Sequence, residues 1–397
     1  MPQRSRRRAS LLRRAVLALG TTAVVAATSA TTVIATAPAS ASTLPGTVTA
    51  VGPLAQQVTL PAAAYGKRIT YWTKGVKDAP ALSSAAIYFP PGKPPAGGWP
   101  VIAWAHGTTG LADHCAYSIG GPIEVQRDWS YLGTWMKQGY AIVATDYVGL
   151  GTPGLMPYLN GKVEAHSVVD SVKAATDLYP SLAKKYVVIG QSQGGGAAIT
   201  TARYATQFQA KGLSYKGAVG TGVPAYIEDL VPLVARPEVK VTLGANSTSY
   251  ILYILSGLRT SFPEWNLDSY LTPYGKYWVD KSETLCDTQA ELTGLLDRNK
   301  VQIGKLFSRP LDQIPNLSAT LKSYMGIPES GYDKPFFIGQ GGLDTDVNTP
   351  GTLALVAKMK ANGQPVTFRL YPDKDHAGTV NASKVDSVPF VKNLFAH

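Results

Sequence analysis

Residues 186–200 read YVVIGQSQGGGAAIT and place one serine, Ser192, between glycines. Four apolar or aromatic residues precede Gly190, and small residues follow the serine, which predicts a buried strand, a turn and a helix. Gly-x-Ser-x-Gly is the pattern of a nucleophile elbow, a turn so tight that only glycine fits two residues before and after the serine. In a chain with 39 glycines the pattern can also arise by chance, so its context decides.

The elements around the serine alternate as in a parallel sheet. Strands are predicted at 68–73, 82–89, 101–106, 140–146, 186–190, 216–222, 335–339 and 366–371. Helices are predicted at 125–137, 164–182, 194–208, 352–362 and 384–395. This alternation favours the α/β class, with a mostly parallel central sheet flanked by helices. From 224 to 333 the alternation stops and large aromatic rings are frequent, so we expect an insertion in the sheet here.

A serine hydroxyl needs a base, a group that orients the base, and donors for the oxyanion that forms. Of five histidines only His376 and His397 follow the serine, and His376 comes directly after the last predicted strand. Sites in open α/β sheets assemble at that edge, which favours His376 as the base. Asp344 is the first acid after the preceding strand and is the predicted orienting group, with Asp346 as the alternative.

Two backbone N–H groups are predicted to bind the oxyanion. The residue after the nucleophile, Gln193, supplies one, and the loop after an early strand supplies the other. That loop begins at His106, and Thr108 is the predicted donor, with Thr109 as the alternative. We expect a structural role for His106, because it precedes the serine in the chain.

The first 41 residues are expected to be a signal peptide for export. Six arginines and no acid precede an apolar run, and Ala39-Ser40-Ala41 then forms a cleavage signal, with the cut after Ala41. The paired arginines leave both general and twin-arginine export open. The threonines in the apolar run make a retained membrane anchor the less favoured alternative. Without these arginines the net charge of +11 falls to +5, and the remaining basic residues are scattered, which disfavours nucleic acid as a partner.

Two cysteines are present, Cys115 and Cys286. In an exported protein such a pair usually forms a disulfide, here between the predicted oxyanion loop and the insertion. Free thiols are one alternative, and a metal site with Asp113 and His114 is another. Three adjacent side chains in a loop converge poorly on one ion, so we expect no metal.

Five segments carry a family resemblance: HGTTGLADHC (106–115), ATDYVGLGTPG (144–154), GQSQGG (190–195), GQGGLDTDV (339–347) and DKDHAG (373–378). In this order they resemble secreted lipases and esterases of the α/β-hydrolase superfamily, in particular the secretory lipase family that includes Candida antarctica lipase A. The resemblance implies an α/β-hydrolase fold and acyl-ester hydrolysis through an acyl-enzyme, without a cofactor.

The resemblance also implies a cap or lid at 223–333, inserted in a core of 42–222 and 334–397. The expected function is therefore that of a secreted serine ester hydrolase acting on small-molecule or lipid esters, including esters at a lipid–water interface. An acyltransferase on cell-envelope lipids or glycans is an alternative with the same triad, and a non-catalytic envelope-binding protein is a further one. Gln191 and Gln193 differ from the apolar neighbours of the serine in some lipases, which leaves the preferred acyl chain length open.

Overall fold

The computed structural model describes residues 42–396, so the predicted signal peptide at 1–41 lies outside the described part. Within this part nine strands form one sheet in the order β1-β2-β3-β5-β4-β6-β7-β8-β9. Their bounds are β1 (Val48–Pro53), β2 (Tyr65–Lys74), β3 (Pro80–Phe89), β4 (Trp99–Ala105), β5 (Ala141–Thr145), β6 (Leu182–Gln191), β7 (Ser214–Thr221), β8 (Phe336–Gly341) and β9 (Val366–Tyr371). Strands β1, β2, β3 and β5 pair antiparallel, and the pairs from β5 through β4 to β9 are parallel.

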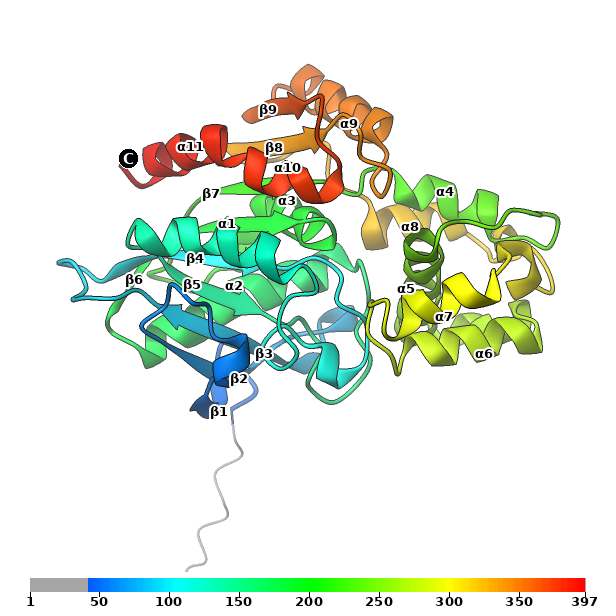
Figure 1. Cartoon of the computed structure of the whole chain (residues 1–397), viewed down its shortest axis with the longest axis horizontal. Coiled ribbons are helices and arrows are strands. Elements are labelled where there is room, and N and C mark those ends of the chain that lie inside the picture. Colours follow the sequence, from blue (N-terminus) through cyan, green and yellow to red (C-terminus); the bar gives the residue numbers. More distant parts are fainter. Residues whose placement is uncertain (1–41, 397) are drawn as a thin grey trace, which may run out of the picture. The chain divides into compact units, whose positions relative to one another are not determined.

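Helices cover both faces of the sheet (Figure 1). Their bounds are α1 (Val125–Lys137), α2 (Gly161–Leu178), α3 (Gln193–Phe208), α9 (Thr349–Ala361), α10 (His376–Ala382) and α11 (Lys384–Ala396). Alternate residues of each buried strand point to opposite faces. Ile102 and Trp104 therefore pack with residues of α1, α10 and α11, whereas Val101 and Ala103 pack with α2, α3 and α9. The predicted mostly parallel sheet flanked by helices is confirmed.

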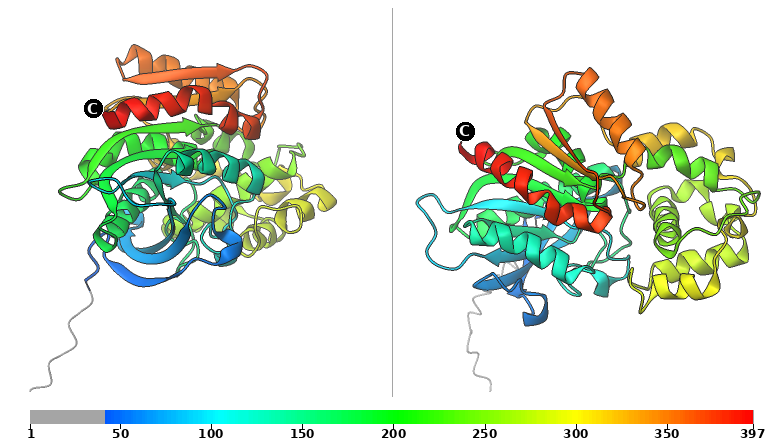
Figure 2. Two further views of the ribbon diagram at one scale, coloured as in Figure 1. Left: turned by 60° about the vertical axis from the view of Figure 1, so that its left-hand side comes forward. Right: turned by 45° about the horizontal axis from the view of Figure 1, so that its top comes forward.

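Helices also fill the segment between β7 and β8, and residues 223–333 are called the cap segment below. Its helices are α4 (Ile227–Val234), α5 (Ala245–Ser261), α6 (Pro273–Ser282), α7 (Leu292–Asn299) and α8 (Leu317–Met325). They gather beside the carboxyl ends of the parallel strands (Figures 1 and 2). Helix α5 packs on α6 and α7, and buries Leu252, Tyr253 and Leu258. No helix of residues 42–396 has both the length and the apolar character needed to cross a bilayer.

Three details differ from the sequence prediction. Helix α2 ends at Leu178 rather than Leu182, because the residue before Pro180 is disfavoured in a helix. The edge strand β1 was not predicted. His376 was predicted in a loop, but it is the first residue of α10, where the Asp375 side chain accepts the Gly378 N–H at 2.7 Å and caps the helix.

A buried carboxyl on α2 provides a test of this packing. Asp170 is 3% exposed, and its Oδ2 accepts a hydrogen bond from the Thr73 hydroxyl of β2 at 2.7 Å. Burial raises the pKa of Asp170 to about 7. The folded protein therefore binds this proton more tightly than the unfolded chain does. The resulting stabilisation is complete below the unfolded pKa of about 4 and is lost as the pH rises through 7.

We therefore expect Asp170→Asn to change the pH dependence of stability. Relative to this variant, the wild-type protein should lose roughly 2–3 kcal/mol of unfolding free energy between pH 5 and pH 8. Urea denaturation of both proteins across this range measures the difference. A difference that stays constant with pH would contradict the assignment of a neutral, buried Asp170.

Candidate active site

Ser192 lies at the junction between β6 and α3, at the carboxyl end of a central strand. Its φ of 58° and ψ of −125° are sparsely populated by any residue other than glycine. A Cβ at Gly190 would overlap the carbonyl oxygen of Gly194, and a Cβ at Gly194 would overlap the last carbonyl of β4. The two glycines of the motif are therefore required by the close contact of three backbone segments, as the elbow interpretation expects.

Asp344 and His376 are in direct contact. His376 Nδ1 lies 2.8 Å from Asp344 Oδ2, although 32 positions separate the two residues. The carboxylate is buried, and its Oδ1 accepts the backbone N–H groups of Asp346 and Val347 at 3.0 and 2.8 Å. Gln340 Nε2 donates to Oδ2 at 3.1 Å. Three donors besides the imidazole thus fix the orientation of the carboxylate, and Asp346 contributes one of them through its backbone.

The other imidazole nitrogen contacts the residue before the serine. Gln191 Nε2 lies 2.9 Å from His376 Nε2. Because an amide nitrogen can only donate, His376 Nε2 is the acceptor and Nδ1 carries the proton that is donated to Asp344. This is the tautomer that a base needs, but the lone pair that would take the Ser192 proton is already hydrogen bonded. Gln191 is therefore a site residue that the sequence analysis named without assigning it a contact.

The predicted oxyanion donors come from two loops beside the serine. Gln193 is the first residue of α3, and backbone N–H groups of a first helical turn have no acceptor within their own helix. Thr108 lies three residues after β4, and its hydroxyl is 2.6 Å from the Tyr158 hydroxyl. Thr109 is buried, and its carbonyl accepts the N–H of Asp287 at 3.0 Å. The assignment of the second donor to Thr108 stays a prediction.

His106 lies in the same loop and is almost fully buried. Its ring packs against Tyr117 and Tyr147 at centroid distances of 5.1 and 4.7 Å. Nδ1 is 2.7 Å from the Gly107 carbonyl oxygen, and burial lowers the pKa of the ring. A neutral imidazole enclosed by aromatic rings supports the loop structurally.

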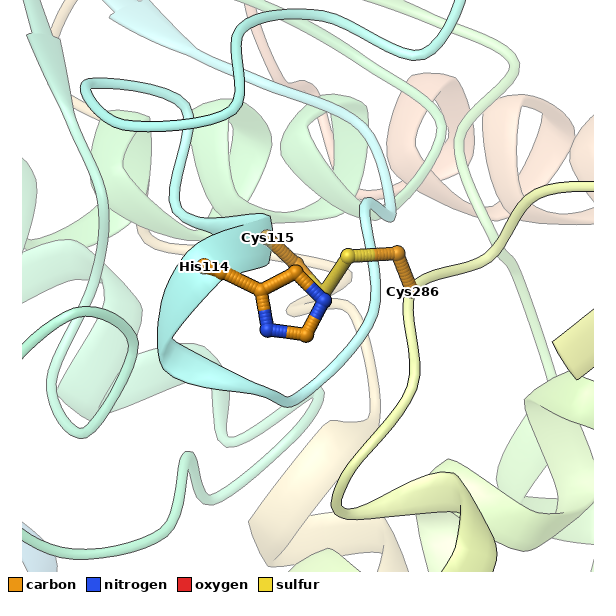
Figure 3. A group of neighbouring side chains, drawn as sticks. All are labelled: His114, Cys115 and Cys286. Atoms are coloured by element: carbon orange, nitrogen blue, oxygen red, sulfur yellow. A yellow bond between two sulfur atoms is a disulfide. The ribbon is translucent and has the colours of Figure 1, made fainter. Parts of the chain in front are cut away.

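A disulfide joins this loop region to the cap segment. Cys115 and Cys286 are bonded, which agrees with the predicted pairing. His114 lies beside the bond (Figure 3). Its Nε2 is 3.3 Å from Glu291 Oε2. Both sulfur atoms are used by the disulfide, so they do not serve as metal ligands here.

Backbone contacts reinforce this connection. Gly110 and Cys286 form an antiparallel bridge, and Asp287 donates its N–H to the carbonyl of Thr109. The Asp287 side chain accepts a hydrogen bond from the Tyr253 hydroxyl at 3.3 Å, and burial raises its pKa to about 6. The cap segment is thus fastened directly to the predicted oxyanion loop.

A separate cleft of about 760 Å³ lies between α2, α3 and α8. Its lining includes Lys162, His166, Tyr204, Phe208 and Tyr324, but none of the three predicted triad residues.

Comparison with known proteins is consistent with this geometry. The fold is that of an α/β-hydrolase: the structure of Candida antarctica lipase A in its closed state matches 89% of the chain and 83% of its own length, with a TM-score of 0.72 and 20% identity. The rice cell wall degrading esterase LipA from Xanthomonas oryzae matches 88% of the chain and 98% of its own length, with a TM-score of 0.64 and 19% identity.

A putative hydrolase from Legionella pneumophila matches 87% of the chain and 98% of its own length, with a TM-score of 0.69 and 17% identity. In sequence, residues 118–297 match the secretory lipase family. The resemblance to this family that the motifs predicted is thereby confirmed. No curated protein sequence matches the chain.

We expect loss of the disulfide to lower stability and to loosen the cap segment first. The bond spans 171 positions, and chain entropy assigns about 5 kcal/mol to so long a loop, as an upper figure. The melting temperature of the reduced protein, or of Cys115→Ser/Cys286→Ser, should fall by roughly 5–10 °C. Hydrogen exchange should increase in residues 223–333 before it increases in the sheet. Two free thiols in the denatured, unreduced protein would contradict the bond itself.

Proposed function

We propose that the protein is a secreted serine carboxylic-ester hydrolase that cleaves lipid-like acyl esters through an acyl-enzyme intermediate. The observation that carries the proposal is the 2.8 Å contact between Asp344 and His376, with His376 Nε2 in its acceptor form beside the elbow of Ser192. The secretory lipase match and the lipase and esterase among the similar structures support ester hydrolysis. The expected leader at 1–41 and the same family match support secretion.

In the proposed reaction Ser192 Oγ attacks the ester carbonyl carbon while His376 Nε2 takes the serine proton. Asp344 keeps the imidazole in the required tautomer and stabilises its protonated form. The backbone N–H groups of Gln193 and Thr108 donate to the oxyanion. The proton then passes from His376 to the departing alkoxide, which leaves as an alcohol. Water attacks the acyl-enzyme with His376 again as base, and the carboxylic acid is released; each group comes from the chain, so no cofactor is proposed.

Aromatic side chains beside Thr108 support an apolar acyl group in the substrate. Tyr253 of α5 is buried, and its ring lies 5.5 Å from that of Tyr158. The Tyr158 hydroxyl in turn contacts the Thr108 hydroxyl. Tyr253 and Tyr158 thus connect the cap segment with Thr108, and aromatic side chains are frequent in the linings of sites that bind apolar groups.

An exposed apolar face on α4 supports substrates at a lipid–water interface. Leu230 and Leu233 lie three positions apart on the same side of this helix and are 45% and 61% exposed. Leucines that protrude from a cap helix can bury apolar area in a lipid surface, which gives about 25 cal/mol for each Å² removed from water.

The triad assignment predicts a steep loss of activity in two variants. With p-nitrophenyl esters, Ser192→Ala should lower kcat on the order of 10⁶-fold, because no other group supplies the nucleophile. Asp344→Asn should lower kcat by about 10⁴-fold, because it reverses the tautomer of the imidazole.

Asp346→Asn is the matched control, since it changes the neighbouring acid and keeps the backbone N–H that Asp344 accepts. It should retain kcat within a few-fold. Equal activity of Ser192→Ala and wild type would overturn the proposed function. A loss in Asp346→Asn that matches the loss in Asp344→Asn would overturn the choice of acid.

The acyl acceptor is tested by adding a competing alcohol during turnover. Hydrolysis predicts the free acid as the main product in water, with its yield falling only in proportion to the alcohol concentration. Preferential formation of the new ester at low alcohol concentration would identify an acyltransferase instead.

The lipid-surface proposal predicts a difference between dispersed and dissolved substrates. Leu230→Ser/Leu233→Ser should lower the rate on a triacylglycerol emulsion by about tenfold and leave hydrolysis of a dissolved short-chain ester unchanged. Val385→Ser is the control, because Val385 is 76% exposed on α11, outside the cap segment. An equal loss on both substrates would contradict a surface-binding role.

A further inference from the structure

The residue after the serine makes a second buried contact that the proposed reaction does not use. Gln193 Nε2 donates to Glu164 Oε1 at 2.8 Å, and both side chains are 3% exposed. Glu164 lies in the first turn of α2, which packs along α3. The amide is also 3.9 Å from the sulfur of Met156. One residue of the elbow is therefore anchored through its side chain to a different helix.

The surroundings of Glu164 are unusual for a carboxyl group. It accepts a hydrogen bond from the Gln193 amide, and the backbone N–H of Leu159 also lowers its pKa, although by less than burial raises it. The ionisable groups that interact electrostatically with it are Tyr147 and Tyr158, both from the connection between β5 and α2, and Tyr324 of α8. Within residues 42–396 no lysine or arginine forms an ion pair with it. Burial raises the pKa of Glu164 to about 7.

Such a buried acid is costly, and an apolar residue of similar size would be expected to fill the space more favourably. Gln193, by contrast, needs an acceptor for its buried amide, and Glu164 supplies one in either protonation state. The presence of Glu164 at this position is therefore explained by the hydrogen bond that it accepts from Gln193, and not by a contribution to the stability of α2.

We propose that Glu164 is a positioning residue of the active site, which holds the Gln193 side chain so that the Gln193 backbone N–H is aimed at the oxyanion. This inference rests on the proposed function. The N–H belongs to the peptide that follows Ser192, whose backbone is already held at a positive φ. Donors to an oxyanion act through a fixed geometry, so a second anchor on the same residue limits its reorientation during the reaction.

The first test separates transition-state binding from ground-state binding. Glu164→Ala should lower kcat on the order of 10–100-fold, which is less than the 10²–10³-fold loss on removal of an oxyanion donor. KM should change by less than about threefold. Affinity for an alkylboronic acid, which adds to the serine and places an oxygen in the oxyanion position, should fall by the same factor as kcat. Glu164→Gln should restore most of the loss, because its amide oxygen can accept the same hydrogen bond.

Asp170→Asn is the matched control: it removes another buried carboxyl of α2 whose burial raises its pKa to about 7, but one that contacts Thr73 rather than Gln193. It should keep kcat and boronic-acid affinity within about twofold. Unchanged kcat and boronic-acid affinity in Glu164→Ala would overturn the proposal.

A double-mutant cycle with Gln193→Leu keeps the proposal testable if Glu164→Ala folds poorly. Glu164→Leu keeps the buried volume and alone should lower kcat on the order of 10–100-fold, but in the Gln193→Leu background, which has no amide for Glu164 to hold, it should have no further effect on kcat. Additive losses would overturn the proposal. Full activity of Ser192→Ala would overturn the proposed function instead. If Ser192→Ala is inactive but substitution of Glu164 leaves kcat unchanged, only this inference is overturned.

Discussion

The backbone of Ser192 is the constraint on which the site depends. A non-glycine residue at positive φ is strained, and it persists only where the surrounding structure determines its conformation. Here the carbonyls of β4 and of the first turn of α3 lie so close that any side chain at Gly190 or Gly194 would overlap them. The contact fixes β4, β6 and α3 relative to one another. It also presents the serine at the edge of the sheet where the loop after β8 brings in Asp344 and the start of α10 brings in His376.

Much of the core could be predicted because its strands are buried on both faces and are therefore continuously apolar. The elements that were not predicted lack a continuous apolar run of this kind. Strand β1, VTAVGP, is a largely exposed edge strand that contains glycine and proline. Helix α10, HAGTVNA, is seven residues long and has no apolar period, so its capping residue Asp375 was its main marker. The end of α2 required attention to Pro180 rather than to the apolar spacing around it.

The candidate site, like the fold, could be predicted only in part from the sequence. The order of serine, acid and base along the chain could be predicted, and the structure brings Asp344 and His376 into contact while their catalytic roles stay proposed. The contacts of the two glutamines could not be predicted, because they join residues 185 and 29 positions apart through side-chain orientation alone. The choice between Thr108 and Thr109 depends on which backbone N–H faces the substrate, and the sequence does not indicate the orientation of these N–H groups. The sequence thus predicted the contact between Asp344 and His376 but not the side chains that hold Asp344, His376 and Gln193 in place.

The hydrogen bond from Gln191 to His376 has a kinetic consequence. Under the proposed mechanism the lone pair on His376 Nε2 must be released, or shared, before Ser192 can lose its proton. A hydrogen bond of this kind contributes about 1 kcal/mol, which corresponds to roughly a fivefold factor in rate. This hydrogen bond occupies the lone pair that would take the serine proton, and it therefore lowers the basicity of His376 Nε2 toward Ser192. Each catalytic cycle would therefore begin when the Gln191 side chain moves away from His376 Nε2, before the serine attacks the ester.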